Sequence, residues 1–192
     1  MDLTFVDADA VARAVSPAAA VRAIEEALRA GLDPAEDFDR QIVETEHGQL
    51  LLMPSRSPSS VGVKLATVAP ANPSHGLPRI QALYVVFDAA TLTPRTLIDG
   101  AALTALRTPA VSIAAVKPAL LTKDSPLHLT VFGAGPQGIG HVATLREVVD
   151  GHRPVASVTH VVRNVATAAL PSGSTVVPAD SPEADDALRR AD

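Results

Sequence analysis

The segment from Leu129 to Gly138, LTVFGAGPQG, constrains this chain more than any other. An apolar run leads directly into a Gly-x-Gly-x-x-Gly pattern at Gly133, Gly135 and Gly138, and a helix-compatible segment follows. In such a unit the first glycine permits a tight turn, the second lets the backbone approach a pyrophosphate, and the third lets the helix pack on the strand. Amides at the start of the helix then face the phosphates. The pattern predicts a dinucleotide-binding loop, although glycines at this spacing also occur in ordinary strand-to-helix turns.

The residues around this loop alternate between strand-like and helix-like patterns. Strands are predicted at 127–132, 157–162 and 174–177, and helices at 137–149 and 183–190. Alternating strands and helices imply a parallel sheet with right-handed crossovers. A complete dinucleotide fold has two such halves. The sequence supplies only the first half, so we expect a Rossmann-type domain that is truncated at Asp192.

The first part of the chain has a different pattern. A helix is predicted from Pro17, with Val21, Ile24 and Leu28 on one face, and a second helix over 101–121, broken near Pro109 and Pro118. Short strands are predicted at 41–46, 49–53, 61–68, 79–88 and 95–98. The predicted fold class is therefore α/β: an α+β domain over residues 1–122, followed by an incomplete Rossmann-type domain over residues 123–192.

Composition excludes several classes of function. The formal charge of −5 and the aromatic fraction of 3% argue against nucleic-acid binding. Cysteine is absent and the six histidines show no ligand-like spacing, so we expect no metal site. The N-terminus is acidic where a signal peptide is basic, and no apolar stretch has the length of a membrane span. We therefore expect a cytoplasmic protein with no membrane partner.

Three basic residues stand among apolar neighbours in the first part of the chain: Arg40, Lys64 and Arg107. A cation in apolar surroundings needs an anionic partner, because burying it alone is costly. That partner is either an acidic side chain of the protein or the carboxylate of a ligand. Residues 163 and 164, after the second strand of the nucleotide unit, are Arg and Asn, where NAD-specific sites usually carry a carboxylate. This favours NADP over NAD, although a solvated arginine would fit as well.

Several short motifs resemble the ornithine cyclodeaminase/mu-crystallin family. They are Met53-Pro54, Gly62-Val-Lys64, Asn72-Pro73 with Gly76-Leu-Pro78, Asp99-Gly100, Leu103-Thr104 with Arg107-Thr108, and Gly133-Ala-Gly135-Pro-Gln137. They follow the order of the family over residues 36–164. The sequence departs from the family at Arg79, which replaces a small hydroxyl residue, and at Pro109, which replaces alanine.

The resemblance implies a substrate-binding first domain that forms a homodimer through its sheet, and a second domain that binds NAD or NADP. It implies that Arg40, Lys64 and Arg107 hold the carboxylate of an amino-acid substrate. It assigns the cofactor contacts to a larger set, which is Thr108, Gly133, Gly135, Pro136, Gln137, Gly138, Arg163 and Asn164. The catalytic aspartate of the family would lie beyond Asp192, so we expect the 192-residue chain alone to be inactive.

Three functions fit these observations. The first is NAD(P)-dependent cyclodeamination of a basic amino acid, L-ornithine to L-proline and ammonia, by hydride transfer. The second is an amino-acid dehydrogenase or ketimine reductase of the same family, which stops after one hydride transfer and therefore consumes cofactor. The third is a non-catalytic, truncated relative that only dimerises or binds nucleotide.

Overall fold

The fold was determined from a computed structural model, which describes residues 3–168 and 170–192. The chain forms two compact units. The first contains residues 3–16 and 26–104, and the second contains residues 17–25 and 105–192. The boundary predicted at residues 122–123 stays a prediction about independently folding domains.

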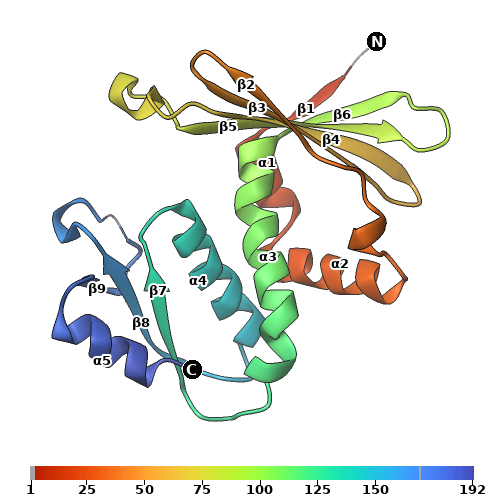
Figure 1. The fold of residues 1–192 in the computed structure, drawn as a ribbon. Helices are drawn as coiled ribbons and strands as arrows, with labels where there is room; N and C mark the ends of the chain where they lie inside the picture. The colour runs from red at the N-terminus through yellow and green to blue at the C-terminus, as the bar shows by residue number, and fades with distance from the viewer. Residues whose placement is uncertain (1–2, 169) are drawn as a thin grey trace. The chain divides into compact units, whose positions relative to one another are not determined.

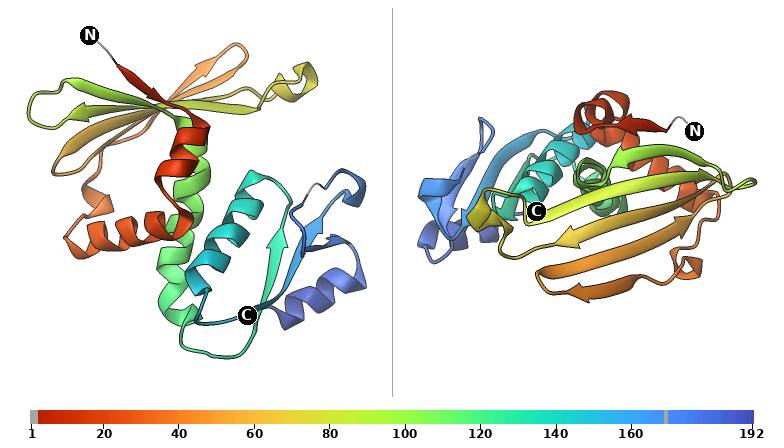
Figure 2. Two further views of the ribbon diagram at one scale, coloured as in Figure 1. Left: turned by 180° about the vertical axis from the view of Figure 1, so that it is seen from behind. Right: turned by 90° about the horizontal axis from the view of Figure 1, so that it is seen from above.

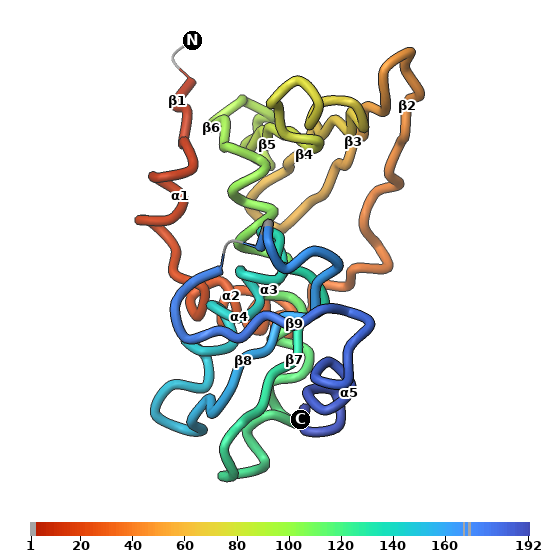
Figure 3. The backbone as a smooth tube through the Cα atoms, turned by 90° about the vertical axis from the view of Figure 1, so that its left-hand side faces the viewer, coloured from red at the N-terminus to blue at the C-terminus, as the bar shows by residue number. Residues whose placement is uncertain are grey.

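The first unit is built on a six-stranded sheet with the strand order β1-β6-β5-β4-β3-β2. Figure 3 shows this order running from β1 at one edge to β2 at the other. All neighbouring pairs are antiparallel except β1 and β6, which are parallel. The strands are β1 (Thr4–Val6), β2 (Gln41–Thr45), β3 (Gly48–Arg56), β4 (Ser60–Val68), β5 (Ile80–Asp88) and β6 (Pro94–Asp99). The five predicted strands are confirmed as β2 to β6, whereas β1 and the short helix α1 (Ala8–Ala14) were not predicted.

Side chains alternate between the two faces of this sheet, so the register decides which residues are neighbours. Lys64 of β4 pairs with Met53 of β3 on one side and with Tyr84 of β5 on the other, and all three side chains therefore share a face. We call this surface the Lys64 face. The opposite face is apolar along the middle of the sheet, where Leu52 pairs with Leu65 and Leu65 pairs with Leu83.

Helix α3 (Gly100–Leu120) follows β6 without interruption. Its first residue packs on the sheet, because a Cβ at Gly100 would lie 2.8 Å from the Cβ of Ala82. The predicted breaks at Pro109 and Pro118 are wrong. Proline removes one helical hydrogen bond at a cost of about 3 kcal/mol, but Pro109 is fully buried and Ala110 beside it is a core residue, so packing holds the helix together.

The second unit contains a parallel sheet with the order β7-β8-β9. Its elements are β7 (Leu127–Phe132), α4 (Pro136–Val149), β8 (Val155–Val162), η3 (Val165–Thr167), β9 (Thr175–Pro178) and α5 (Pro182–Arg190). Figures 1 and 2 show α4 and α5 on opposite faces of this sheet. The predicted alternation of strands and helices is confirmed.

The core of the second unit joins segments that are far apart in the sequence. Ala20 and Val21 of α2 (Pro17–Arg29) pack with Ala110 and Ile113 of α3, and with Leu127, Leu145 and Val149. An ion pair of 3.0 Å between the Lys117 ammonium and the Glu25 carboxylate links α3 to α2. Within the described part of the chain, no helix is both long enough and apolar enough to cross a bilayer.

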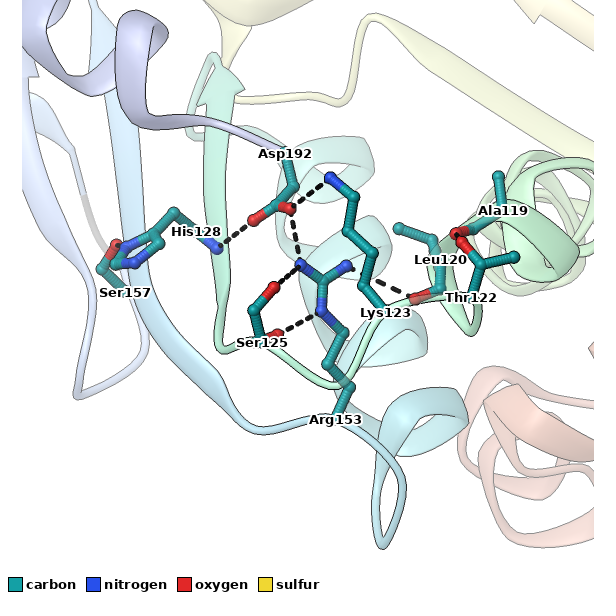
Figure 4. Close-up of polar contacts among 9 residues, drawn as sticks. All are labelled: Ala119, Leu120, Thr122, Lys123, Ser125, His128, Arg153, Ser157 and Asp192. Carbon is teal, nitrogen blue, oxygen red and sulfur yellow. Dashed lines mark hydrogen bonds and ion pairs between the residues drawn. The ribbon is translucent and has the colours of Figure 1, made fainter.

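A polar cluster around Arg153 fixes the beginning of β7, and Figure 4 shows its contacts. The Arg153 side chain is only 3% exposed. Its guanidinium donates to the carbonyl oxygens of Leu120 and Ser125 and pairs with the Asp192 carboxylate. Asp192 also accepts from the backbone N–H of His128, and its own N–H donates to the His128 carbonyl. A buried cation therefore joins the loop before β7 to the last residue of the chain.

Replacing Arg153→Met is expected to lower the unfolding temperature by about 5 °C or more, because two carbonyls and a carboxylate lose their partner. Thermal unfolding followed by circular dichroism measures this. Arg189→Met is the matched control, since the Arg189–Asp186 pair is exposed and should contribute little. An equal loss for the two variants would contradict a structural role of Arg153.

The same cluster predicts a pH dependence. The Arg153 hydrogen bond lowers the pKa of Asp192 to about 2. A lowered pKa stabilises the folded state above the ordinary value, and this stabilisation is lost as the pH falls through the folded value. The difference in stability between the unaltered chain and Asp192→Asn should therefore be full at pH 7 and shrink from about pH 4 towards about pH 2. A constant difference over this range would contradict the pairing.

Candidate functional site

The glycine loop between β7 and α4 has the geometry that its sequence predicts. Gly133 has a φ of +104°, a conformation that side chains other than glycine rarely adopt. Gly135 is the N-cap of α4 and makes no side-chain cap hydrogen bond, and Pro136 occupies the first turn. The amides of this turn therefore have no side-chain cap, as an anion site requires.

The three glycines have different surroundings. A Cβ at Gly138 would lie 3.0 Å from the Gly133 carbonyl oxygen and 3.2 Å from a Val131 methyl carbon, so the third glycine permits the close packing of α4 on β7. A Cβ at Gly133 or Gly135 would have no described heavy atom within 4 Å. The first two glycines thus border open space, as the close approach of a ligand to the backbone requires.

Two buried or partly buried histidines hold this loop. His160 on β8 is 1% exposed, and its Nδ1 lies 2.8 Å from the Gly133 carbonyl oxygen. His141 on α4 has its Nδ1 2.7 Å from the Gln137 carbonyl oxygen and its Nε2 3.1 Å from the Ser112 hydroxyl. Because a carbonyl oxygen can only accept, Nδ1 of each ring carries a proton.

The His141 contacts extend to a further predicted cofactor residue. The Ser112 hydroxyl also lies 3.2 Å from the Thr108 carbonyl oxygen, and its single proton can be donated either to this oxygen or to Nε2 of His141. His141 therefore connects Gln137 at the glycine loop with Thr108 on α3 through a single serine. Sequence reasoning gave neither histidine a role, because their partners depend on how α3, α4 and β8 pack.

A cavity of about 730 Å³ lies beside the loop. Its lining includes Gly133 and, at the end of β8, Arg163 and Asn164. None of the described residues that line it is acidic. The open glycines, the uncapped helix and this cavity fit a dinucleotide, whose phosphates would lie on the first turn of α4.

The first unit carries the other group of predicted site residues. The Lys64 ammonium lies 3.5 Å from the Thr104 hydroxyl, and Thr104 lies in the first part of α3. The positions that surround Lys64 on its face are apolar or neutral, namely Leu51, Met53, Ser55, Gly62, Ala66, Ala82, Tyr84 and Val86. The Lys64 face is therefore a cation within a largely apolar surface.

No described contact places the other two predicted cations, Arg40 and Arg107, beside Lys64. Arg40 immediately precedes Gln41, which pairs with Leu52, so a continuation of the register would put Arg40 beside Met53 in the row of Lys64. Arg40 is exposed. Arg107 is an exposed residue of α3 in the second unit. Because β2 begins only at Gln41, the convergence of Arg40 and of Arg107 with Lys64 stays a prediction.

These features define a two-unit α/β protein, with a glycine-rich loop in a parallel βαβ unit and a separate sheet that carries Lys64 among apolar and neutral positions. Comparison with known proteins agrees. The model of the ornithine cyclodeaminase/mu-crystallin family matches residues 3–170. The chain belongs to this family, as its motifs predicted.

Among characterised relatives, the chain is 30% identical over 111 residues to Delta(1)-pyrroline-2-carboxylate reductase 2 of Burkholderia ambifaria. That match covers 57% of this chain and 35% of the relative. The chain thus matches about a third of the length of this relative.

Solved structures give the same result. An archaeal alanine dehydrogenase dimer with bound NAD has a TM-score of 0.75 at 25% identity, covering 93% of this chain and 57% of that one. Delta(1)-pyrroline-2-carboxylate reductase of Thermococcus litoralis, in complex with NADH and L-proline, has a TM-score of 0.73 at 26% identity, covering 86% and 51%. A lysine cyclodeaminase has a TM-score of 0.69 at 27% identity, covering 94% and 56%. The second unit is thus the Rossmann-type part of an α/β fold.

The glycine loop leads to a test by substitution. Gly135→Ala should leave the unfolding temperature nearly unchanged, because the added methyl meets no atom of the protein. It should weaken binding of a nicotinamide dinucleotide about tenfold, or ~1.4 kcal/mol, because the methyl occupies space next to the phosphates. Fluorescence titration with NADH measures this. Equal binding by Gly135→Ala and the unaltered chain would contradict the assignment.

Proposed function

We propose that this protein is an NAD(P)-dependent enzyme that reduces a cyclic α-imino acid, such as Δ1-pyrroline-2-carboxylate, to the corresponding amino acid. The observation that carries the proposal is the Lys64 face, where a cation for a carboxylate is surrounded by apolar and neutral positions. The likeness to two pyrroline-2-carboxylate reductases supports the same substrate class.

The chemistry follows from the groups that each unit presents. A bound NAD(P)H supplies hydride to the carbon of the C=N bond. Lys64 and Arg40, with Arg107, hold the carboxylate of the imino acid and so fix the orientation of that carbon. The leucine and methionine next to Lys64, Leu51 and Met53, contact the ring and exclude water from it. The imine nitrogen gains one proton in the same reduction, and the resemblance assigns this proton transfer to an aspartate.

Cyclodeamination of a basic amino acid, with L-ornithine as the substrate, is the second candidate. The likeness to a lysine cyclodeaminase favours it. A second support is Asp37, whose negative charge raises the pKa of Tyr84 on the Lys64 face and would attract the second amine of such a substrate. Net cofactor consumption separates the two. A reductase consumes one NAD(P)H for each amino acid formed, whereas a cyclodeaminase regenerates its cofactor.

The cofactor preference is proposed to be NADP. Arg163 is exposed at the edge of the cavity, and the described lining offers no carboxylate for a ribose 2′-hydroxyl. A guanidinium there favours a 2′-phosphate. In titrations of the unaltered chain, NADPH is therefore expected to bind more tightly than NADH, and the reverse order would contradict the preference.

Lys64→Ala is the direct test of the carboxylate site. It should weaken binding of L-proline, the product of the proposed reaction, by about tenfold or more, because a charge-assisted contact of ~1.5–3 kcal/mol is lost. Binding of NADPH should stay unchanged. Calorimetric titration measures both, and Arg79→Ala serves as a matched loss of an exposed cation. Unchanged affinity for L-proline in Lys64→Ala would refute the site.

The protein is also proposed to be a homodimer, joined through the sheet face opposite Lys64, and to act in the cytoplasm. On that face, Leu83 of the inner strand β5 is 41% exposed and Phe5 of the edge strand β1 is 54% exposed, so the face presents large apolar side chains to solvent. A second copy of the chain would cover both. The alanine dehydrogenase that the chain resembles is a dimer.

Leu83→Asp should convert a dimer into a monomer, because a charge would be buried in the apolar interface. Light scattering after size-exclusion chromatography measures the mass. Gln81→Glu, two residues earlier on the same face, is the control for charge alone. A mass of 19.8 kDa for the unaltered chain, or a dimer that survives Leu83→Asp, would contradict this interface.

A further inference from the structure

Tyr84 is the polar aromatic residue of the Lys64 face, and the proposed reaction assigns no role to its hydroxyl group. It pairs directly with Lys64 across β5 and β4, so the two side chains leave the same face about 5 Å apart. Its ring lies over Gly62, the residue two positions before Lys64. A Cβ at Gly62 would come 2.2 Å from the Tyr84 hydroxyl oxygen and 2.6 Å from its Cε1. The phenol hydroxyl therefore lies where a side chain of residue 62 would be.

This hydroxyl has no hydrogen bond to any residue within 3–168 or 170–192, although the side chain is partly buried. The oxygen is not among the fully buried unpaired atoms of the described residues, so it borders accessible space. The surrounding positions on the face offer few candidates, because Gly62, Ala66 and Val86 have no polar side-chain atom. The Tyr84 hydroxyl can therefore donate or accept a hydrogen bond with a ligand above the Lys64 face.

The hydroxyl lies near charges of both signs, because Lys64 is its neighbour on the face and the negative charge of Asp37 is also close. Burial and the nearby charge of Asp37 both raise the pKa of Tyr84, so the hydroxyl stays neutral at physiological pH. Asp37 follows the short helix η1 (Pro34–Glu36) and accepts from the Phe38 N–H with one carboxylate oxygen. The same negative charge that disfavours a phenolate favours a positively charged group next to the hydroxyl.

We infer that the Tyr84 hydroxyl oxygen accepts a hydrogen bond from the nitrogen of the substrate while Lys64 holds its carboxylate. The inference rests on the proposed function and adds the second recognition point of that site. A protonated cyclic imine and the secondary ammonium of the product both carry an N–H next to a carboxylate. The Lys64 ammonium and the neutral Tyr84 hydroxyl, which lies over Gly62 on the same face, match this pair of groups.

This two-point contact selects among ligands with a carboxylate. A five-membered ring acid with oxygen in place of nitrogen keeps the carboxylate and the shape, but it has no N–H to donate. Tyr84 should therefore discriminate between L-proline and (S)-tetrahydrofuran-2-carboxylate, whereas Lys64 should not. A tyrosine that only packs over Gly62 would affect both ligands equally.

The experiment is a calorimetric titration of the unaltered chain, Tyr84→Phe and Lys64→Ala with each of these two ligands, at saturating NADPH. Tyr84→Phe should weaken L-proline binding about tenfold or more and change the binding of the oxygen analogue less than about twofold. Lys64→Ala should weaken both. Tyr84→Phe keeps the ring over Gly62, so its unfolding temperature should match that of the unaltered chain.

Gly62→Ala provides a second variant, because the added Cβ displaces the hydroxyl without removing it. It should reproduce the selective loss of L-proline binding. If Tyr84→Phe weakens neither ligand, or weakens both equally, the role of Tyr84 is refuted while the carboxylate site stands. If the unaltered chain does not bind L-proline, or Lys64→Ala has no effect, the proposed function itself fails.

Discussion

The register of three antiparallel strands is the constraint on which the substrate site depends. Because β3, β4 and β5 pair without a shift around Lys64, Met53, Lys64 and Tyr84 form one row on one face. A slip of a single residue in either pair would send a neighbour of Lys64 to the opposite face. Gly62 contributes to the same arrangement, since only glycine leaves room for the Tyr84 ring. The chemistry of the face is therefore set by backbone pairing.

In the second unit, contacts from β8 likewise fix the shape of the glycine loop. Gly133 is held from β8 twice, by its N–H donating to the Val161 carbonyl and by its carbonyl meeting His160. Gly138 lets α4 approach this carbonyl closely. The loop is thus fixed in shape by protein contacts on one side, while Gly133 and Gly135 border open space on the other. A preformed loop of this kind needs little reorganisation to bind phosphate.

Local sequence patterns predicted most of the elements but not the contacts between them. The glycine loop, the strands β2 to β6 and the alternation after residue 127 are encoded within a few residues, and the structure confirms them. The helix over α3 was wrongly predicted to break, because the burial of Pro109 depends on residues that are remote in sequence. β1 was missed because three residues gain strand structure only by pairing with β6.

For the candidate site, the sequence singled out Lys64 and Arg40 as cations among apolar residues. The resemblance to the family then predicted that they bind a carboxylate. The sequence did not single out Tyr84, His160 or Arg153, because the role of each depends on a partner from another strand or loop. The position of the Tyr84 hydroxyl over Gly62 cannot be predicted from the sequence, because the two residues lie on different strands.

A crystal structure of the chain with L-proline and NADPH tests the central claim most directly. The account predicts the proline carboxylate on the Lys64 ammonium and the ring nitrogen within hydrogen-bond distance of the Tyr84 hydroxyl. Proline bound elsewhere, or with its carboxylate turned away from Lys64, would contradict it.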